Sequence, residues 1–234
     1  MKRKHYILPL LLIALFSLKT KAQIENVIVE TYYVSDSLDA TDTIGGYLAP
    51  GSKTYRIYVD LAPGCKIRKI FGDTTHALRF SSTGIFFNHV DRGELYGSDM
   101  YISHLDEGTV ALDTYITLGQ TTKNATSTYY GILKPQDPDT SIIGGVHNDG
   151  GSDTIPDGLI SNQDAAAGIP VTLKDGMVVF GNPPSNQGGD GLDSTIFGPL
   201  NVDSELVTNN AYYLCSGATG ADTISNQVLV AQLT

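Results

Sequence analysis

The chain has 234 residues, of which 41% are hydrophobic and 17% are charged. This composition supplies material for a core and excludes disorder throughout. Its 15 basic and 25 acidic side chains give a formal net charge of −10, which argues against nucleic acid or an anionic membrane surface as a partner.

Residues 1–22 have the pattern of a signal peptide. Basic residues 2–4 precede an apolar run over residues 6–16, and residues 20–22 (TKA) place small side chains where signal peptidase cuts. The run is too short to span a bilayer comfortably, although an anchored helix is the alternative. The leader holds five basic residues and no acidic one, so a mature chain from Gln23 would carry −15. We expect export to the outside or the cell surface, or to the periplasm, with no membrane span in the mature chain.

The first two predicted strand regions open the mature chain. Ile24–Val34 is rich in β-branched and aromatic residues, which predicts a strand. After a polar loop, Tyr55–Phe71 (YRIYVDLAPGCKIRKIF) alternates apolar and polar residues on both sides of Pro63-Gly64. Proline and glycine favour a tight turn, so the pattern predicts a β-hairpin with Tyr55, Ile57, Val59 and Leu61 on the buried face and their neighbours in water.

Further strands are predicted along the rest of the chain. They cover Ala77–Ser82, Thr109–Leu118, Thr128–Leu133, Met177–Phe180, Glu205–Cys215 and Asn226–Leu233. The second and third of these would form another hairpin. The closing VLVAQL is apolar nearly throughout, which favours a place in the middle of a sheet.

The fold class that follows is all-β. About eight short strands separated by turn residues predict a β-sandwich of immunoglobulin-like or jelly-roll-like type, with an irregular barrel as the alternative. We expect one domain over residues 23–234, with a loop-rich insertion at about 134–170 where glycine and proline are frequent.

Four segments of the chain carry a family resemblance. ENVIVETYYVSD, YRIYVDLAPGCKIRKIFGD, FFNHVDRGELYG and VALDTYITLG resemble a group of exported proteins of Bacteroidetes-type bacteria, which share a segment like YRIYVDLAPGYKLQAVFG. The resemblance covers most of the mature chain and implies an exported β-rich domain, but it implies no particular activity. Cys65 stands where the group usually has an aromatic residue.

The two cysteines, Cys65 and Cys215, both fall in or beside predicted strands. An exported chain meets an oxidising compartment, which favours a disulfide between them. Two buried, unpaired thiols are the alternative. Because of the departure at Cys65, such a disulfide would be particular to this protein.

Acidic, glycine-rich loops are candidate calcium sites, because calcium takes six to eight oxygen ligands from carboxylates, carbonyls and water. The candidate ligands in two loops are Asp36, Asp39, Asp42, Asp149, Asp153 and Asp157. A third and weaker loop is GGDGLD, with Asp190 and Asp193. The spacing is not that of an EF-hand, and ordinary solvated turns would use the same residue types.

Catalytic motifs are missing from the sequence. It contains no HExxH zinc motif, no GxSxG elbow and no phosphate-binding glycine loop. His89 and Asp91 in NHVDRG are interpreted as a structural corner rather than a reactive pair. A pair of carboxylates that meets only in space stays open, since sequence does not exclude it.

The sequence therefore predicts a secreted or surface-exposed, non-catalytic β-sandwich module for adhesion, matrix or surface structure, with calcium as a candidate stabilising ion. Its partner would be a surface polymer, a glycan or a protein. The first alternative is a carbohydrate-binding module, which would use tyrosines such as those of the pairs 32–33, 129–130 and 212–213. The second is a hydrolase with a spatially assembled carboxylate site.

Overall fold

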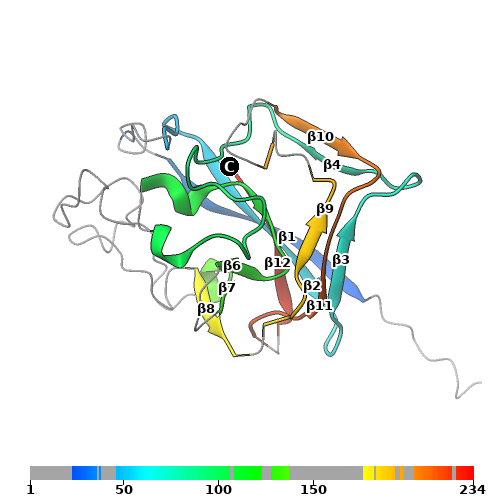
Figure 1. Ribbon diagram of the computed structural model, residues 1–234. Coiled ribbons are helices and arrows are strands. Elements are labelled where there is room, and N and C mark those ends of the chain that lie inside the picture. The colour runs from blue at the N-terminus through cyan, green and yellow to red at the C-terminus, as the bar shows by residue number, and fades with distance from the viewer. Residues whose placement is uncertain are drawn as a thin grey trace, which may run out of the picture.

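The computed structural model describes residues 23–35, 37, 46–105, 108–122, 128–136, 176–181, 183–192, 196–197, 203–222 and 225–234. These residues form twelve strands and three short 3₁₀ turns (Figure 1). The strands are β1 (Ile24–Val34), β2 (Lys53–Leu61), β3 (Ile67–Phe71), β4 (Leu78–Ser81), β5 (Tyr115–Ile116), β6 (Gln120–Thr122), β7 (Thr128–Gly131), β8 (Met177–Phe180), β9 (Gly188–Asp190), β10 (Glu205–Thr208), β11 (Tyr212–Ala218) and β12 (Gln227–Leu233). The 3₁₀ turns are η2 (Ile102–His104), η3 (Gly108–Leu112) and η4 (Lys134–Gln136). The all-β class is confirmed, and the several packed sheets are consistent with a β-sandwich.

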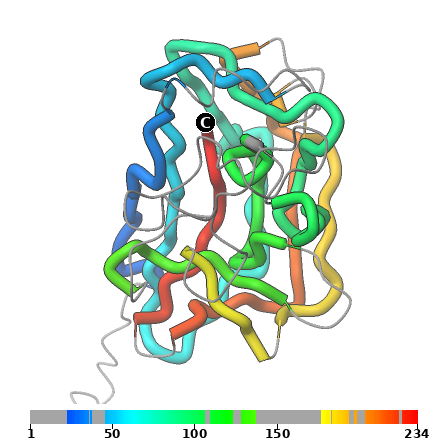
Figure 2. The backbone as a smooth tube through the Cα atoms, turned by 90° about the vertical axis from the view of Figure 1, so that its left-hand side faces the viewer, coloured from blue at the N-terminus to red at the C-terminus, as the bar shows by residue number. Residues whose placement is uncertain are grey.

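The central layer is a four-stranded sheet in the order β1-β2-β12-β5. Three smaller sheets surround it, in the orders β3-β11-β9, β10-β4 and β6-β7-β8. Figure 2 shows β1 outermost, with β2 beside it and β12 further in. The strand from the closing VLVAQL lies between β2 and β5, which confirms its predicted place inside a sheet.

The turn after β2 was predicted correctly, but the hairpin was not. Cys65 N donates to Ala62 O over 2.9 Å, and Gly64 has φ +80°, a conformation that glycine adopts without strain. However, β2 pairs with β1 and β12, whereas β3 pairs with β11. The turn therefore carries the chain from one sheet into the next instead of folding it back onto its neighbour.

The main core lies between the central sheet and the layer that contains β11 and β10. Val59 and Val228 from the central sheet meet Tyr213 and Cys215 of β11 and Leu206 of β10 there. Ile57 and Ile67 pack against this cluster. The inward face predicted for β2 is therefore confirmed at Ile57, Val59 and Leu61.

The other face of the central sheet is also covered, which corrects the prediction of a wet face on β2. Arg56 is 2% exposed and Tyr58 is 0% exposed. Tyr58 packs with Tyr115 and Leu229 beneath Leu133. Because β2 is an inner strand with layers on both sides, Arg56 and Tyr58 are as buried as the apolar residues that alternate with them.

Two further predictions were wrong in detail. The segment predicted as a strand over 109–118 begins with η3 and keeps only β5 as a strand, and β7 pairs with β6 and β8 instead. The predicted GGDGLD loop begins with β9. The predicted insertion at 134–170 lies outside the described residues after residue 136. In the described part of the chain, no helix is long and apolar enough to cross a membrane.

Candidate functional site

The predicted calcium ligands fall where the structure gives no description. Asp36, Asp39, Asp42, Asp149, Asp153, Asp157 and Asp193 lie outside the described residues. Asp190 ends β9 and is exposed. Among the residues that are described, no three His, Cys, Asp or Glu side chains gather as a metal site would require. The calcium site therefore stays a prediction.

The predicted disulfide is not present, because both cysteines are free. Cys215 Sγ lies 3.7 Å from Ile67 O, and Cys65 packs at the margin of the same core cluster. Cys215 lies in β11, whereas Cys65 lies in the connection between the end of β2 and the start of β3. Two unpaired thiols, the alternative that the sequence left open, are therefore what the structure shows.

An exposed sheet edge is the first candidate site. Ile24, Val27 and Val29 of β1 are 53%, 54% and 60% exposed. Val27 and Val29 pair with Val59 and Ile57 of β2, so they extend the same face that forms the main core. In the described part of the chain, β1 pairs with β2 alone. The apolar face of the central sheet therefore continues past the core to an open edge.

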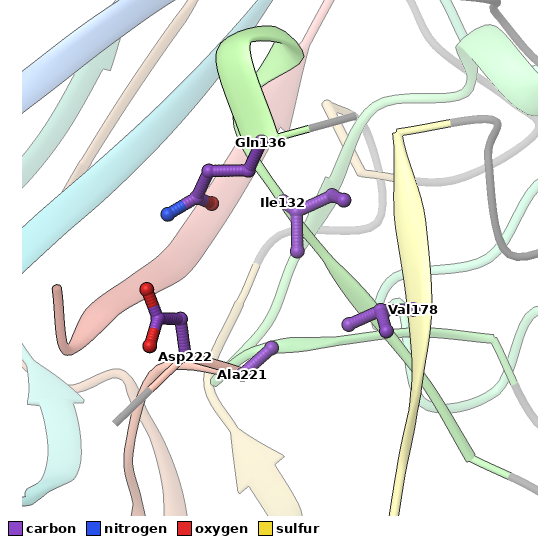
Figure 3. A pocket seen from close by; sticks show the side chains of 5 residues that line it. All are labelled: Ile132, Gln136, Val178, Ala221 and Asp222. Atoms are coloured by element: carbon purple, nitrogen blue, oxygen red, sulfur yellow. The ribbon is translucent and has the colours of Figure 1, made fainter. Parts of the chain in front are cut away.

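A shallow pocket of about 350 Å³ is the second candidate site. Figure 3 shows the Gln136 and Asp222 side chains on one side of it, with Ile132, Val178 and Ala221 forming the apolar side. Gln136 Nε2 donates to Ser225 Oγ over 2.9 Å. Such a volume lies at the lower end for small-molecule sites, and the mixed lining suits a small polar ligand with one apolar face.

Hydrogen bonds fix the polar side of the pocket, which Gln136 and Asp222 form. Ser225 Oγ donates to Asp222 Oδ2 over 3.1 Å, and Asn226 N donates to Asp222 O over 2.9 Å. Gln136 Oε1 accepts from Leu133 N over 3.2 Å. These bonds connect η4 to the turn before β12, so the amide and the carboxylate are fixed by the backbone of two distant segments.

A buried arginine that sequence reasoning missed links three parts of the fold. Arg56 Nε donates to Gln232 Oε1 over 2.9 Å, and Arg56 Nη1 donates to Gly176 O over 2.8 Å. Its guanidinium also stacks 3.6 Å from the centre of the Tyr32 ring. A Cβ at Gly176 would lie 2.9 Å from Arg56 Nη1, so this close approach requires glycine. Because Arg56 is buried and bonded to groups of its own chain, we assign the cluster a structural role.

Glu30 and Lys134 lie at the margin of this arginine cluster. Lys134 N donates to Glu30 Oε1 over 2.7 Å. Burial raises the pKa of Glu30, although this hydrogen bond and the charges of Arg56 and Lys134 act in the opposite direction. Burial lowers the pKa of Lys134, opposed by the charge of Glu30. The pair joins η4 to β1 beside the open edge.

A second buried polar group organises the NHVDRG loop. Asp113 is 0% exposed, and its carboxylate accepts from His89 N and Glu94 N, each over 2.8 Å. Burial raises the pKa of Asp113 to about 8, against the effect of these donors. His89 Nδ1 lies 3.6 Å from Asp91 Oδ1. The loop therefore folds around a single carboxyl group, and Asp113 anchors it.

The chain was compared with protein-family models, with curated proteins and with solved structures, and none of the three comparisons found a match. The open edge and the pocket are therefore the features from which a function is inferred.

Proposed function

We propose that this chain is an exported, non-catalytic β-sandwich module that makes contacts at a cell surface or in an extracellular matrix. The observation that carries the proposal is the open edge of β1, where Ile24, Val27 and Val29 are each more than half exposed. Exposed apolar edge strands pair with strands of other chains, and soluble proteins usually block them. The basic and apolar leader over residues 1–22 supports export.

The site chemistry favours contact over catalysis. The buried polar side chains described above, Arg56 and Asp113, are bonded to backbone and side-chain groups of their own chain. Neither faces the pocket, whose lining offers one carboxylate, Asp222. Hydrolysis by paired carboxylates needs two such groups about 5–10 Å apart across a substrate. We therefore assign the contact surface to the open edge of β1.

The test compares attachment by cells that lack the chain and cells to which a version has been restored. We expect the wild-type chain to restore attachment and Val27→Lys/Val29→Lys not to restore it, because lysines block an edge strand. The matched control is Val90→Lys/Val207→Lys, which changes two valines that are 55% and 56% exposed. Equal attachment with and without the chain would contradict the proposal.

Glycan binding is the second candidate function, and the pocket of Figure 3 favours it. Sugars present hydroxyl groups and an apolar face, which match Gln136, Asp222 and the aliphatic side of the pocket. Against it, both members of the pair Tyr32–Tyr33 are buried, so that pair offers no aromatic platform. A glycan array probed with the wild-type protein and with Asp222→Ala tests it. A glycan signal that Asp222→Ala removes would support this function, and an array without signal would exclude it.

A further inference from the structure

The backbone of β1 shows which of its groups face the open side. Val27 N donates to the side chain of its neighbour, Asn26 Oδ1, over 2.9 Å. Thr31 O accepts from Lys134 Nζ over 3.2 Å. Both backbone groups belong to odd-numbered residues, and both have side chains as their hydrogen-bond partners. Backbone groups alternate in direction along an antiparallel strand. The odd-numbered residues, Val29 included, therefore present their N–H and C=O groups to the edge.

A second copy of β1 fits this edge in one register. A two-fold axis through Ile28 places Val27 of each copy opposite Val29 of the other, and the two Ile28 side chains opposite each other. Shifting the axis to Val27 sets Val29 against Glu25, and shifting it to Val29 sets Ile28 against Glu30. Apolar side chains directly opposite each other stabilise a strand pair. The shifted registers instead place carboxylates directly opposite apolar side chains.

The polar residues on either side of the apolar ones agree with the same register. With the axis at Ile28, Asn26 of each copy lies opposite Glu30 of the other, so an amide and not an apolar side chain faces each carboxylate. Lys134 Nζ already donates to Thr31 O, so the ladder ends there and consists of the bonds between Val27 and Val29.

We propose that this chain forms a two-fold dimer through antiparallel β1–β1 pairing about Ile28, which joins the two central sheets into one eight-stranded sheet. The inference deepens the proposed function, and rests on it, by naming the partner of the open edge as a second copy of the chain. Val27 and Val29 exchange both backbone hydrogen bonds with their counterparts, and their apolar side chains form a continuous strip on one face.

The first experiment measures the mass of the protein from residue 23 onward by light scattering over a range of concentrations. We expect a dimer that strengthens as salt is added, because each copy is acidic overall. Val27→Lys/Val29→Lys places lysines opposite lysines and should be monomeric, as should Val27→Glu/Val29→Glu. An equimolar mixture of these two variants should dimerise again, and Val90→Lys/Val207→Lys should behave as wild type.

The second experiment tests the register by disulfide trapping in a Cys65→Ser background. Ile28→Cys lies opposite itself in a pair without backbone hydrogen bonds, where the Cα atoms are about 4.5 Å apart, so oxidation should link the two copies. Asn26→Cys lies four residues, or about 13 Å, from its own counterpart and should not link. Circular dichroism confirms that each variant is folded.

Three outcomes would overturn the inference: a wild-type protein that stays monomeric at all concentrations and salt levels, a lysine variant that dimerises as wild type does, or trapping at Asn26→Cys without trapping at Ile28→Cys. A monomeric protein whose lysine variant still abolishes cell attachment would overturn the dimer and leave the proposed function standing. A protein that is dimeric in solution, with a lysine variant that leaves cell attachment unchanged, would keep the dimer and contradict the proposed function.

Discussion

The guanidinium carbon of Arg56 lies 3.6 Å from the centre of the Tyr32 ring, and both side chains are almost completely buried. A cation is placed inside a sheet with an aromatic face, a side-chain amide and a backbone carbonyl as its neighbours. Gln232, the amide, also donates to Ala111 O and Asp113 O, each over 2.8 Å. The cluster therefore fixes β2 and β12 against η3 and the start of β8.

Replacing Arg56 should destabilise the protein strongly. Arg56→Met leaves Gly176 O without its donor and Gln232 Oε1 with only the longer bond from Tyr115 Oη, and we expect a loss of about 3–5 kcal/mol in the free energy of unfolding. Arg56→Lys keeps the charge but loses the planar stacking, and should cost less. Urea denaturation measures both. The control is Arg79→Met, whose ion pair with Glu205 lies at the surface and should matter by less than about 1 kcal/mol. An unchanged urea midpoint for Arg56→Met would refute the structural role.

Asp113 should make stability depend on pH. Its pKa is raised to about 8 in the folded protein from an ordinary value of 3.8. A raised folded-state pKa gives stability that is complete below the unfolded pKa and is lost as the pH rises through 8. We expect the free energy of unfolding to fall between pH 5 and 8 by up to about 1.4 kcal/mol per pH unit from this group.

Asp113→Asn is the comparison for that pH dependence. The variant should be less stable than wild type at pH 5, since its amide N–H₂ would face one of the two backbone donors, His89 N or Glu94 N. Its stability should vary less between pH 5 and 8. Parallel profiles for the two proteins would show that Asp113 is ionised in the fold throughout this range.

Gly119 should not tolerate a side chain. It has φ +92°, and a Cβ there would lie 2.2 Å from the Tyr130 ring. Both the backbone conformation and the contact oppose Gly119→Ala, and we expect a loss of more than about 2 kcal/mol. Gly84→Ala is the control, because nothing lies within 4 Å of its added Cβ. Melting temperatures of the two variants measure the difference, and equal values would contradict the geometry.

Calcium stays a prediction from the acidic loops. We expect calcium to raise the melting temperature and a chelator to lower it, because an ion that binds only the folded state stabilises it. Two triple variants separate the loops, one with Asp36, Asp39 and Asp42 changed to Asn, and one with Asp149, Asp153 and Asp157 changed to Asn. A melting temperature that changes with neither calcium nor chelator would contradict calcium binding.

Local pattern was enough to predict much of the strand content. Ile24–Val34 is predicted with the bounds that β1 has, and the Pro63-Gly64 turn is correctly placed, because propensity and turn chemistry act over a few neighbouring residues. Period-two alternation also identifies one inward face of β2 correctly. These features need no information from the rest of the chain.

Only the tertiary structure decided which strands pair and what covers them. Arg56 has the sequence context of a solvent-facing residue, yet it is buried because β12 and the residue before β8 bring it partners from 176 and 120 residues away. Cys65 and Cys215 are unpaired, which composition could not decide, because a disulfide depends on the distance between the two backbones. Val29 resembles a core valine in sequence and is exposed because no described strand lies beyond β1. Burial depends on contacts between segments that are distant in the sequence. The alternation of residues along one strand carries no information about those contacts.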